Sequence, residues 1–286
     1  MHIPLQSRLP KTHHIVSMKQ ETAHVKTFTF DTSFGALPGQ FLMVWLPGFD
    51  EVPMSIAMDD GEQTKITFFD VGDMTKKLFT LREGDLVGLR GPFGTFYEWE
   101  KNQHLILVAG GYGAAPMYFV AKEALKDGCT VDFVVGARGK EHLLYLDEIG
   151  TLKKTTLHVA TDDGSVGHKG YNTEVLEQLL KSNVSPRAES RGESMVFACG
   201  PELMLKRVSE LCIKHQVPCS LSLERYMKCG FGICGNCTVD PLGIRLCCEG
   251  PVVKNELCAK IADFGQYHRD SVGRKHSFEN PSKKDS

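Results

Sequence analysis

The spacing of hydrophobic residues changes near residue 103, and the chain beyond it alternates between two patterns. Short apolar runs are typical of buried strands, whereas apolar residues every three or four positions predict helices. The predicted strands are 104–109, 130–136, 156–160, 194–198 and 218–223, and the predicted helices are 115–126, 143–152, 172–181 and 202–215. This strand–helix alternation predicts a central α/β domain with a doubly wound parallel sheet.

Residues 1 to about 100 carry a different pattern, in which short β-prone runs are separated by turn residues. Lys26–Phe30 and Lys65–Phe69 are rich in threonine and aromatic residues, and turn signals with proline or glycine follow at 37–39, 46–48 and 59–61. Short strands with frequent turns predict a small antiparallel β-barrel.

The last part of the chain has little periodic pattern. Residues 224 to about 258 are rich in glycine and cysteine, which suits a small domain organised around a metal centre. The polar segment 182–193 is expected to be a surface loop, and the polar tail from about 265 is expected to fray. We therefore divide the chain into a barrel (1–100), an α/β domain (101–223), a metal domain (224–260) and a tail (261–286).

Composition narrows the classes of protein. The 286 residues have a formal net charge of −2, which argues against a nucleic-acid-binding protein held by a strongly basic face. No apolar run approaches the length of a membrane span, and the N-terminus lacks the apolar region of a signal peptide, so we expect a cytoplasmic protein. Five of the ten cysteines lie within residues 229–248, and such clustering in a reducing compartment indicates metal rather than disulfides.

The clustered cysteines have an informative spacing. Cys229, Cys234 and Cys237 form a C-x₄-C-x₂-C motif, which with a fourth, later cysteine is the spacing of plant-type [2Fe–2S] ferredoxins. Cys247 and Cys248 are adjacent candidates for that fourth ligand. The alternative is a structural zinc site, but such sites usually combine C-x₂-C pairs or one pair with histidines.

Three loops at the ends of predicted strands are candidates for nucleotide binding. They contain Gly110, Gly111, Gly113 and Pro116; Thr161, Asp162 and Asp163; and Cys199, Gly200 and Pro201. The carboxyl ends of parallel strands meet at one sheet edge, where ligands bind in open α/β folds, so the set favours a nicotinamide nucleotide. Taken singly, the glycine motif could be a packing turn and Cys199 a small buried filler.

In the predicted barrel, two stretches stand out: Val52, Pro53, Met54 and Ser55, and the segment that contains Gly72 and Thr75. From the residues alone, the first is a strand with a proline and the second the start of a helix.

Together these motifs resemble the ferredoxin–NADP reductase superfamily and, more narrowly, the family of electron-transfer subunits of NAD-dependent dihydroorotate dehydrogenases. The resemblance covers residues 10–258 and is most specific over 223–251. It implies that Cys247, not Cys248, is the fourth ligand. It also implies that Pro53, Met54 and Ser55 lie along the FAD ring, with Ser55 near its reactive nitrogen, and that Gly72 and Thr75 cradle the phosphates.

One residue departs from the family pattern. The flavin motif of the family usually begins with an arginine that offsets the pyrophosphate charge, whereas this chain has Val52. Lys76 or Lys77 could compensate.

The resemblance further implies a relay from NAD through FAD to the cluster, with Ser55 and Cys199 as candidate catalytic residues. The expected partner is an FMN-containing catalytic subunit that oxidises dihydroorotate to orotate in pyrimidine synthesis, in a heterotetramer. Two alternatives stay open: a diaphorase subunit of a hydrogenase or of a ferredoxin:NADP oxidoreductase, and a non-catalytic regulator that uses the cluster as a redox sensor.

Overall fold

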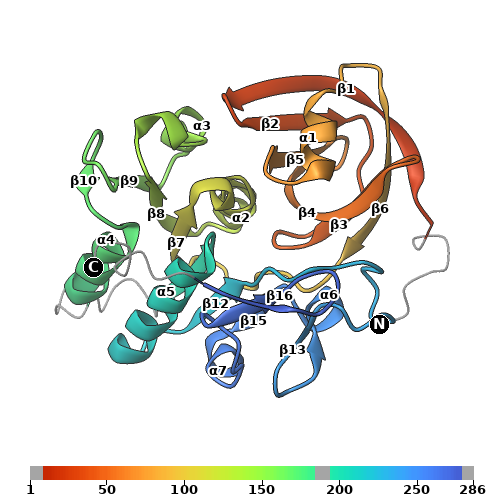
Figure 1. Cartoon of the computed structure of the whole chain (residues 1–286). Coiled ribbons are helices and arrows are strands. Elements are labelled where there is room, and N and C mark those ends of the chain that lie inside the picture. The colour runs from red at the N-terminus through yellow and green to blue at the C-terminus, as the bar shows by residue number, and fades with distance from the viewer. Residues whose placement is uncertain (1–8, 184–193, 279–286) are drawn as a thin grey trace.

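A β-barrel lies beside a parallel sheet, and the cysteine-rich segment runs beneath both in the computed structural model, which describes residues 9–183 and 194–278 (Figure 1). The barrel is closed by six strands in the order β1-β2-β5-β4-β3-β6. They are β1 (Lys11–Thr22), β2 (Val25–Phe30), β3 (Phe41–Leu46), β4 (Asp50–Asp59), β5 (Thr64–Phe69) and β6 (Leu86–Phe93). Neighbouring strands are antiparallel, so the predicted barrel is confirmed.

Alternating side chains fill the barrel. Along β5 every second residue is buried, as expected for a strand with one face on a core. The interior includes the fully buried Phe28, Phe30, Ile56 and Ile66. The short helix α1 (Asp73–Phe79) follows β5 and inserts Leu78 into the same core, which fixes the start of α1 beside the strands.

The second unit is a seven-stranded sheet in the order β10-β9-β8-β7-β11-β12-β15. Its strands are β7 (His104–Gly110), β8 (Thr130–Ala137), β9 (Thr155–Thr161), β10 (His168–Lys169), β11 (Met195–Cys199), β12 (Cys219–Ser222) and β15 (Val252–Lys254). All neighbouring pairs are parallel except β12 and β15. The predicted doubly wound sheet is confirmed.

Helices cover both faces of this sheet. Helix α2 (Ala114–Lys126) packs in one apolar cluster through residues such as Met117. Helices α4 (Asn172–Asn183) and α5 (Glu202–His215) pack in the other, through residues such as Leu176 and Leu205. Within the described residues, no helix is both long and apolar enough to cross a membrane.

Two expectations about local structure need correction. The predicted helix 143–152 is shortened to α3 (Leu146–Gly150); the 3₁₀ turn η3 (Lys140–His142) precedes the predicted range, and the backbone at Leu143 is extended. Within the tail expected to fray, β16 (Tyr267–Arg269) and β17 (Lys275–Ser277) form a hairpin, and residues 279–286 lie outside the described residues. Of the expected loop 182–193, residues 184–193 lie outside the described residues.

Side-chain contacts explain the hairpin despite its polar sequence. Tyr267 Oη donates to the Asp240 carboxylate at 3.1 Å, and Arg269 Nη2 pairs with the same carboxylate at 2.6 Å. Lys275 Nζ lies 4.2 Å from the centre of the Tyr267 ring. These partners come from another segment or the opposite strand, so spacing along the tail does not reveal them.

The cysteine-rich segment joins the other two units. It contains β13 (Thr238–Val239), β14 (Ile244–Arg245), α6 (Leu246–Glu249) and α7 (Asn255–Cys258), besides β15 at the sheet edge. The Thr95 N–H, just after the barrel, donates to the Gly250 carbonyl at 2.6 Å, and Tyr97 Oη donates to the Ala198 carbonyl in β11 at 2.9 Å.

A carboxylate ties three strands of the sheet together near their amino-terminal halves. Asp132 in β8 lies 2.9 Å from His104 Nε2 in β7 and 2.8 Å from His158 Nε2 in β9. Desolvation opposes the charge of this partly buried carboxylate. The hydrogen bonds and charges of the two histidines outweigh desolvation and lower the pKa of Asp132 far below its usual value.

Candidate functional site

The carboxyl edge of the sheet holds the three loops expected to bind nucleotide. Ala109 at the end of β7 is paired with Cys199 of β11, and Ala137 of β8 with Thr161 of β9. The loops that follow β7 and β11 are in direct contact, because a Cβ on Gly113 would lie 2.0 Å from the Cys199 carbonyl oxygen. The Thr161 loop is two strands from β7, roughly 10 Å away along the edge.

Hydrogen bonds within the Thr161 loop, which follows β9, fix its shape. Thr161 Oγ1 donates to the Val166 carbonyl at 2.8 Å, and Asp163 accepts from both the N–H and the hydroxyl of Ser165. Asp162 and Asp163 are exposed at this edge. Desolvation raises the pKa of Asp162, whereas the hydrogen bonds from Ser165 lower that of Asp163.

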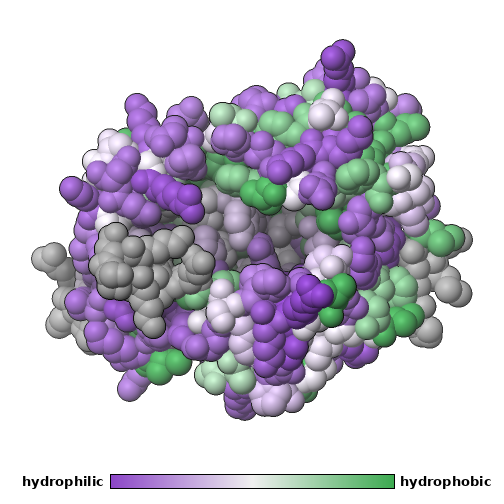
Figure 2. Space-filling view, in the orientation of Figure 1, coloured by the Kyte–Doolittle hydropathy of each residue, from purple (hydrophilic) through white to green (hydrophobic). Residues whose placement is uncertain are grey.

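A cavity of about 510 Å³ opens between the barrel and the sheet, and Figure 2 shows the hollow near the centre of this face. Every residue expected to contact the flavin lines it: Val52, Pro53, Met54, Ser55, Gly72 and Thr75. Of the residues expected to bind nucleotide, Pro116 lines it as well. Cys199 is not among the lining residues; it is 2% exposed, and desolvation raises the pKa of its thiol.

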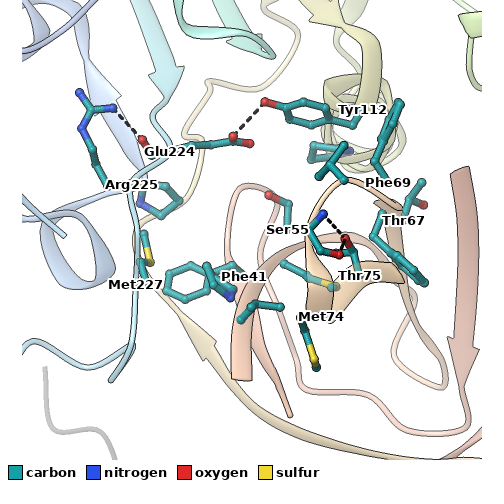
Figure 3. Close-up of a pocket in the computed structure, with 18 of the residues that line it drawn as sticks. Phe41, Ser55, Thr67, Phe69, Met74, Thr75, Tyr112, Glu224, Arg225 and Met227 are labelled. Atoms are coloured by element: carbon teal, nitrogen blue, oxygen red, sulfur yellow. Dashed lines mark hydrogen bonds between the residues drawn. The ribbon is translucent and has the colours of Figure 1, made fainter. Parts of the chain in front are cut away.

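Several lining residues were not anticipated from the sequence (Figure 3). Tyr112 Oη donates to the Glu224 carboxylate at 2.9 Å across the cavity, and its ring meets that of Phe69 edge-on at 5.9 Å. Burial raises the pKa of Glu224, and the nearby Glu202 adds to the effect. Glu224 and Arg225 directly follow the last predicted parallel strand and lie in the stretch where the family resemblance is most specific. These two sequence signals could have drawn attention to them.

Among the described residues that line this cavity, Arg225 is the one cation, and carboxylates already pair with it. It donates to Glu202 at 2.5 and 3.0 Å and lies 3.2 Å from Asp263. Lys76 and Lys77 are exposed and do not line the cavity. Val52 therefore leaves the wall without a free arginine or lysine.

The cavity fits a flavin in its shape and chemistry. Its walls carry flat or apolar side chains such as Phe41, Pro53 and Met54, and its polar groups include the hydroxyls of Ser55 and Thr67. Mostly apolar cavities of this size with a few placed polar groups are typical cofactor sites. The Gly72 turn is open, since a Cβ there would meet only Thr75 Oγ1 at 3.9 Å.

The cysteine loop has the donor set of an iron–sulfur site. The side chain of Cys229 interacts with that of Cys234, and Cys237 with Cys247. Backbone N–H groups point at the sulfurs: Gly232 N lies 3.1 Å from Cys247 Sγ, and Ile233 N lies 3.3 Å from Cys229 Sγ. Positive φ angles at Gly230, Gly232 and Gly235 allow the loop to curl in this way.

These contacts favour a thiolate at two of the cysteines. Contact with the Cys247 side chain and nearby N–H groups lower the pKa of Cys237, and the same contact raises the pKa of Cys247. Desolvation acts to raise the pKa of Cys229, but N–H groups, led by that of Cys234, outweigh it and lower the pKa to about 7. The thiolate is the form that binds metal.

The four motif cysteines contact one another in two pairs, Cys229 with Cys234 and Cys237 with Cys247. A [2Fe–2S] cluster needs only two ligands at each iron, as the two cysteine pairs provide. Cys247 is 2% exposed and faces the loop amides. The sulfur of Cys248 is also near the loop, because a Cβ on Gly232 would lie 2.7 Å from it.

Known proteins match this combination over nearly the whole chain. Residues 107–210 match the oxidoreductase NAD-binding domain family, and residues 224–257 match the iron–sulfur cluster binding domain of dihydroorotate dehydrogenase B. A Methanocaldococcus jannaschii protein described as a probable dihydroorotate dehydrogenase B (NAD+) electron transfer subunit is 41% identical over 90% of this chain and 94% of its own length. The chain belongs to this family. A Methanothermobacter thermautotrophicus member is 39% identical over 93% of this chain and 97% of its own length.

Solved structures extend the family relation to the fold. A chain of an NADH-dependent reduced ferredoxin–NADP oxidoreductase is 29% identical, with a TM-score of 0.74 over 87% of this chain and 89% of its own length. Plasmodium falciparum ferredoxin–NADP+ reductase, at 15% identity, has a TM-score of 0.61 over 72% of this chain and 91% of its own length. This chain thus has the ferredoxin–NADP reductase fold.

Proposed function

We propose that this chain is the electron-transfer subunit of an NAD-dependent dihydroorotate dehydrogenase and carries FAD and a [2Fe–2S] cluster. The observation that carries the proposal is the direct packing of the cysteine loop on the barrel that walls the cavity. A Cβ on Gly230 would lie 2.8 Å from Met43 Cγ, and Met43 is paired across the strands with Pro53 of the cavity wall. The barrel strand that contains Met43, β3, therefore lies between the cavity and the cysteine loop.

The chain's residues have distinct tasks in this proposal. Val52, Pro53 and Met54 hold the flavin ring, Ser55 contacts its reactive edge, and Gly72 and Thr75 hold the phosphates. The sheet-edge loops at 110–116, 161–163 and 199–201 bind the nicotinamide nucleotide. Ser55 and Cys199 are the candidate catalytic residues of this proposal; Cys199 is buried at the end of β11 and is not among the residues that line the cavity. Cys229, Cys234, Cys237 and Cys247 hold the cluster.

The chemistry that these bound groups supply is the exchange of an electron pair, carried as hydride, for single electrons. The protein's part is to keep the donor and acceptor sites close and to limit access of water. The clustered thiols suit a reducing compartment, and we propose a cytoplasmic location.

The partner in this proposal is an FMN-containing catalytic subunit that oxidises dihydroorotate. Cys234 is exposed, and the neighbouring Ile233 is 74% exposed, so the tip of the cluster loop presents an apolar surface. Interface centres are depleted of charge, which fits a docking role for this tip.

The similarity to the ferredoxin–NADP oxidoreductase chain favours a second candidate, a subunit of such an oxidoreductase. Its identity of 29% is lower than the 39–41% of the dihydroorotate dehydrogenase B relatives, which also match over more of the chain. The identity of the co-purifying partner separates the two candidates: an FMN-containing dehydrogenase or a larger flavoprotein.

A Cys234→Ser variant tests the order of the sites. If the flavin lies between nicotinamide and cluster, we expect the variant to reduce ferricyanide with NADH while losing dihydroorotate-dependent NAD reduction with the catalytic subunit. Cys129→Ser, at a buried cysteine just before β8, should retain both activities. Full coupled activity in the Cys234→Ser protein would show that the cluster is not on the path.

A further inference from the structure

A buried arginine joins the barrel to the cluster loop. Arg90, in β6, is 6% exposed. Its Nε and Nη2 donate to the two carboxylate oxygens of Glu51, in β4, at 2.6 and 2.5 Å. This paired geometry fixes the plane of the guanidinium group.

The remaining donors of Arg90 are directed at the cluster loop. Nη1 donates to the carbonyl of Cys229, the first ligand of the motif, at 2.6 Å, and Nη2 lies 3.4 Å from the Lys228 carbonyl. The guanidinium carbon lies 5.5 Å from the ring centres of both Phe93 and Phe231. Arg90 therefore holds the backbone of a ligand residue in place and is shielded from water by aromatic rings.

The ion pair is also oriented. Arg90 donates directly to the loop, whereas Glu51 holds the guanidinium from the barrel side. The positive end of the pair is thus presented to the cluster site. One-electron reduction of the site adds one negative charge, and a nearby buried cation favours the form with more negative charge. Shielding from solvent keeps this effect from being screened by salt.

We propose that Arg90 is a positioning residue that anchors the first cluster ligand and raises the reduction potential of the cluster. The inference rests on the proposed function, because it requires the cluster. It assigns to the Arg90–Glu51 pair the control of how readily an electron crosses from the barrel side to the loop.

Two charge-neutralising variants test this role in the full chain, with the midpoint potential read by EPR during a redox titration. Arg90→Gln removes the cation and should shift the potential in the negative direction. Glu51→Gln leaves the cation without its counter-charge and should shift the potential in the positive direction. Lys228→Gln is the matched control: this lysine adjoins Cys229 but is half exposed and paired with Asp50, so its shift should be smaller and should vanish at high salt.

Shifts of opposite sign support the proposal, since a loosened loop alone would affect both variants in the same direction. Shifts of the same sign, or none in either variant, overturn it. If Arg90→Gln does not retain its cluster, the midpoint potentials of Arg90→Lys and Glu51→Gln test the proposal instead. A lysine that keeps the potential near the wild-type value, with a positive shift for Glu51→Gln, supports the role. A negative shift for Arg90→Lys together with no positive shift for Glu51→Gln overturns it. Loss of the cluster from all three variants would show an anchoring role alone and overturn the assignment of the potential to Arg90. Wild-type protein without any cluster would instead contradict the proposed function itself.

Discussion

Two adjacent cysteines differ sharply in their surroundings. The Cys247 side chain contacts Cys237, and its sulfur lies 3.1 Å from the Gly232 amide. Cys248 is half-buried, and its sulfur lies 3.8 Å from that of Cys247. Spacing alone cannot separate the two, because both follow the same strand. In the short helix α6 (Leu246–Glu249), Cys247 is buried and Cys248 is only partly buried.

We therefore expect Cys247→Ser to lose or destabilise the cluster, while Cys248→Ser leaves the visible spectrum nearly unchanged. The physical reason is that only Cys247 completes a pair with Cys237. Visible absorption and iron content of anaerobically purified protein measure the outcome, with Cys248→Ser as the internal control. The reverse pattern would show that the fourth ligand is Cys248.

The residues of the cavity show which side chains a motif can reveal. Ser55 and Thr75 were predicted because each belongs to a short stretch that resembles a known family, and both line the cavity. Glu224 and Tyr112 meet only in three dimensions, across 112 positions of sequence. No local pattern specifies such a pair.

At the scale of elements, the glycine-rich turn before α2 shows how closely the loop after β7 approaches the end of β11. Gly113 has an ordinary helical φ of −61°, so its freedom of conformation is not what matters. The limiting factor is space, because the Cys199 carbonyl occupies the position of a side chain.

We expect Gly113→Ala to destabilise the protein by about 1–3 kcal/mol, the usual cost of overpacking a rigid interior. The urea midpoint of unfolding is the measurement. Gly150→Ala is the matched control, since nothing lies within 4 Å of a Cβ there; it should be neutral or slightly stabilising. Equal stability of the two variants would contradict the close approach of the two loops.

Element prediction succeeded where one period extends over many residues. Helix α5 has the predicted limits of 202 and 215, and α2 begins one residue before its predicted start. It failed at 143–152, where Tyr145 takes a left-handed φ of 61° that no apolar spacing indicates. The hairpin at 267–277 was missed because its stability depends on Asp240, far from it in sequence.

At the scale of the whole molecule, stability should depend on pH through the carboxylate that ties β7, β8 and β9. The folded-state pKa of Asp132 is lowered, so its contribution is fully present above the ordinary value of 3.8 and declines as the pH falls below that value. Above it, Asp132 is ionised in both the folded and the unfolded states, so its own titration no longer changes the stability.

Asp132→Asn should therefore lower the urea midpoint at pH 7, and the difference from wild type should shrink between about pH 4 and pH 3. Parallel unfolding series at several pH values measure this. Asp31→Asn, at an exposed carboxylate, should leave the midpoint nearly unchanged throughout. A difference for Asp132→Asn that grew on acidification would have the wrong sign for a lowered pKa.

The order of barrel, sheet and cysteine-rich segment was predictable because each part has its own periodicity or composition. The contacts between these parts could not be predicted. In the sequence Arg90 is an ordinary barrel residue, yet it donates a hydrogen bond to the carbonyl of Cys229, 139 positions later. Likewise, β15 lies among the cysteines in sequence but pairs with β12 of the sheet.

The placement of β15 has a consequence for synthesis of the chain. As the polypeptide leaves the ribosome, β12 can join the sheet while its outer edge still lacks a neighbour, because Val252–Lys254 emerges later. An open edge strand is a template for association with other chains. The segment that binds iron thus also covers this edge, and nascent chains stalled before residue 252 should be the most prone to aggregate.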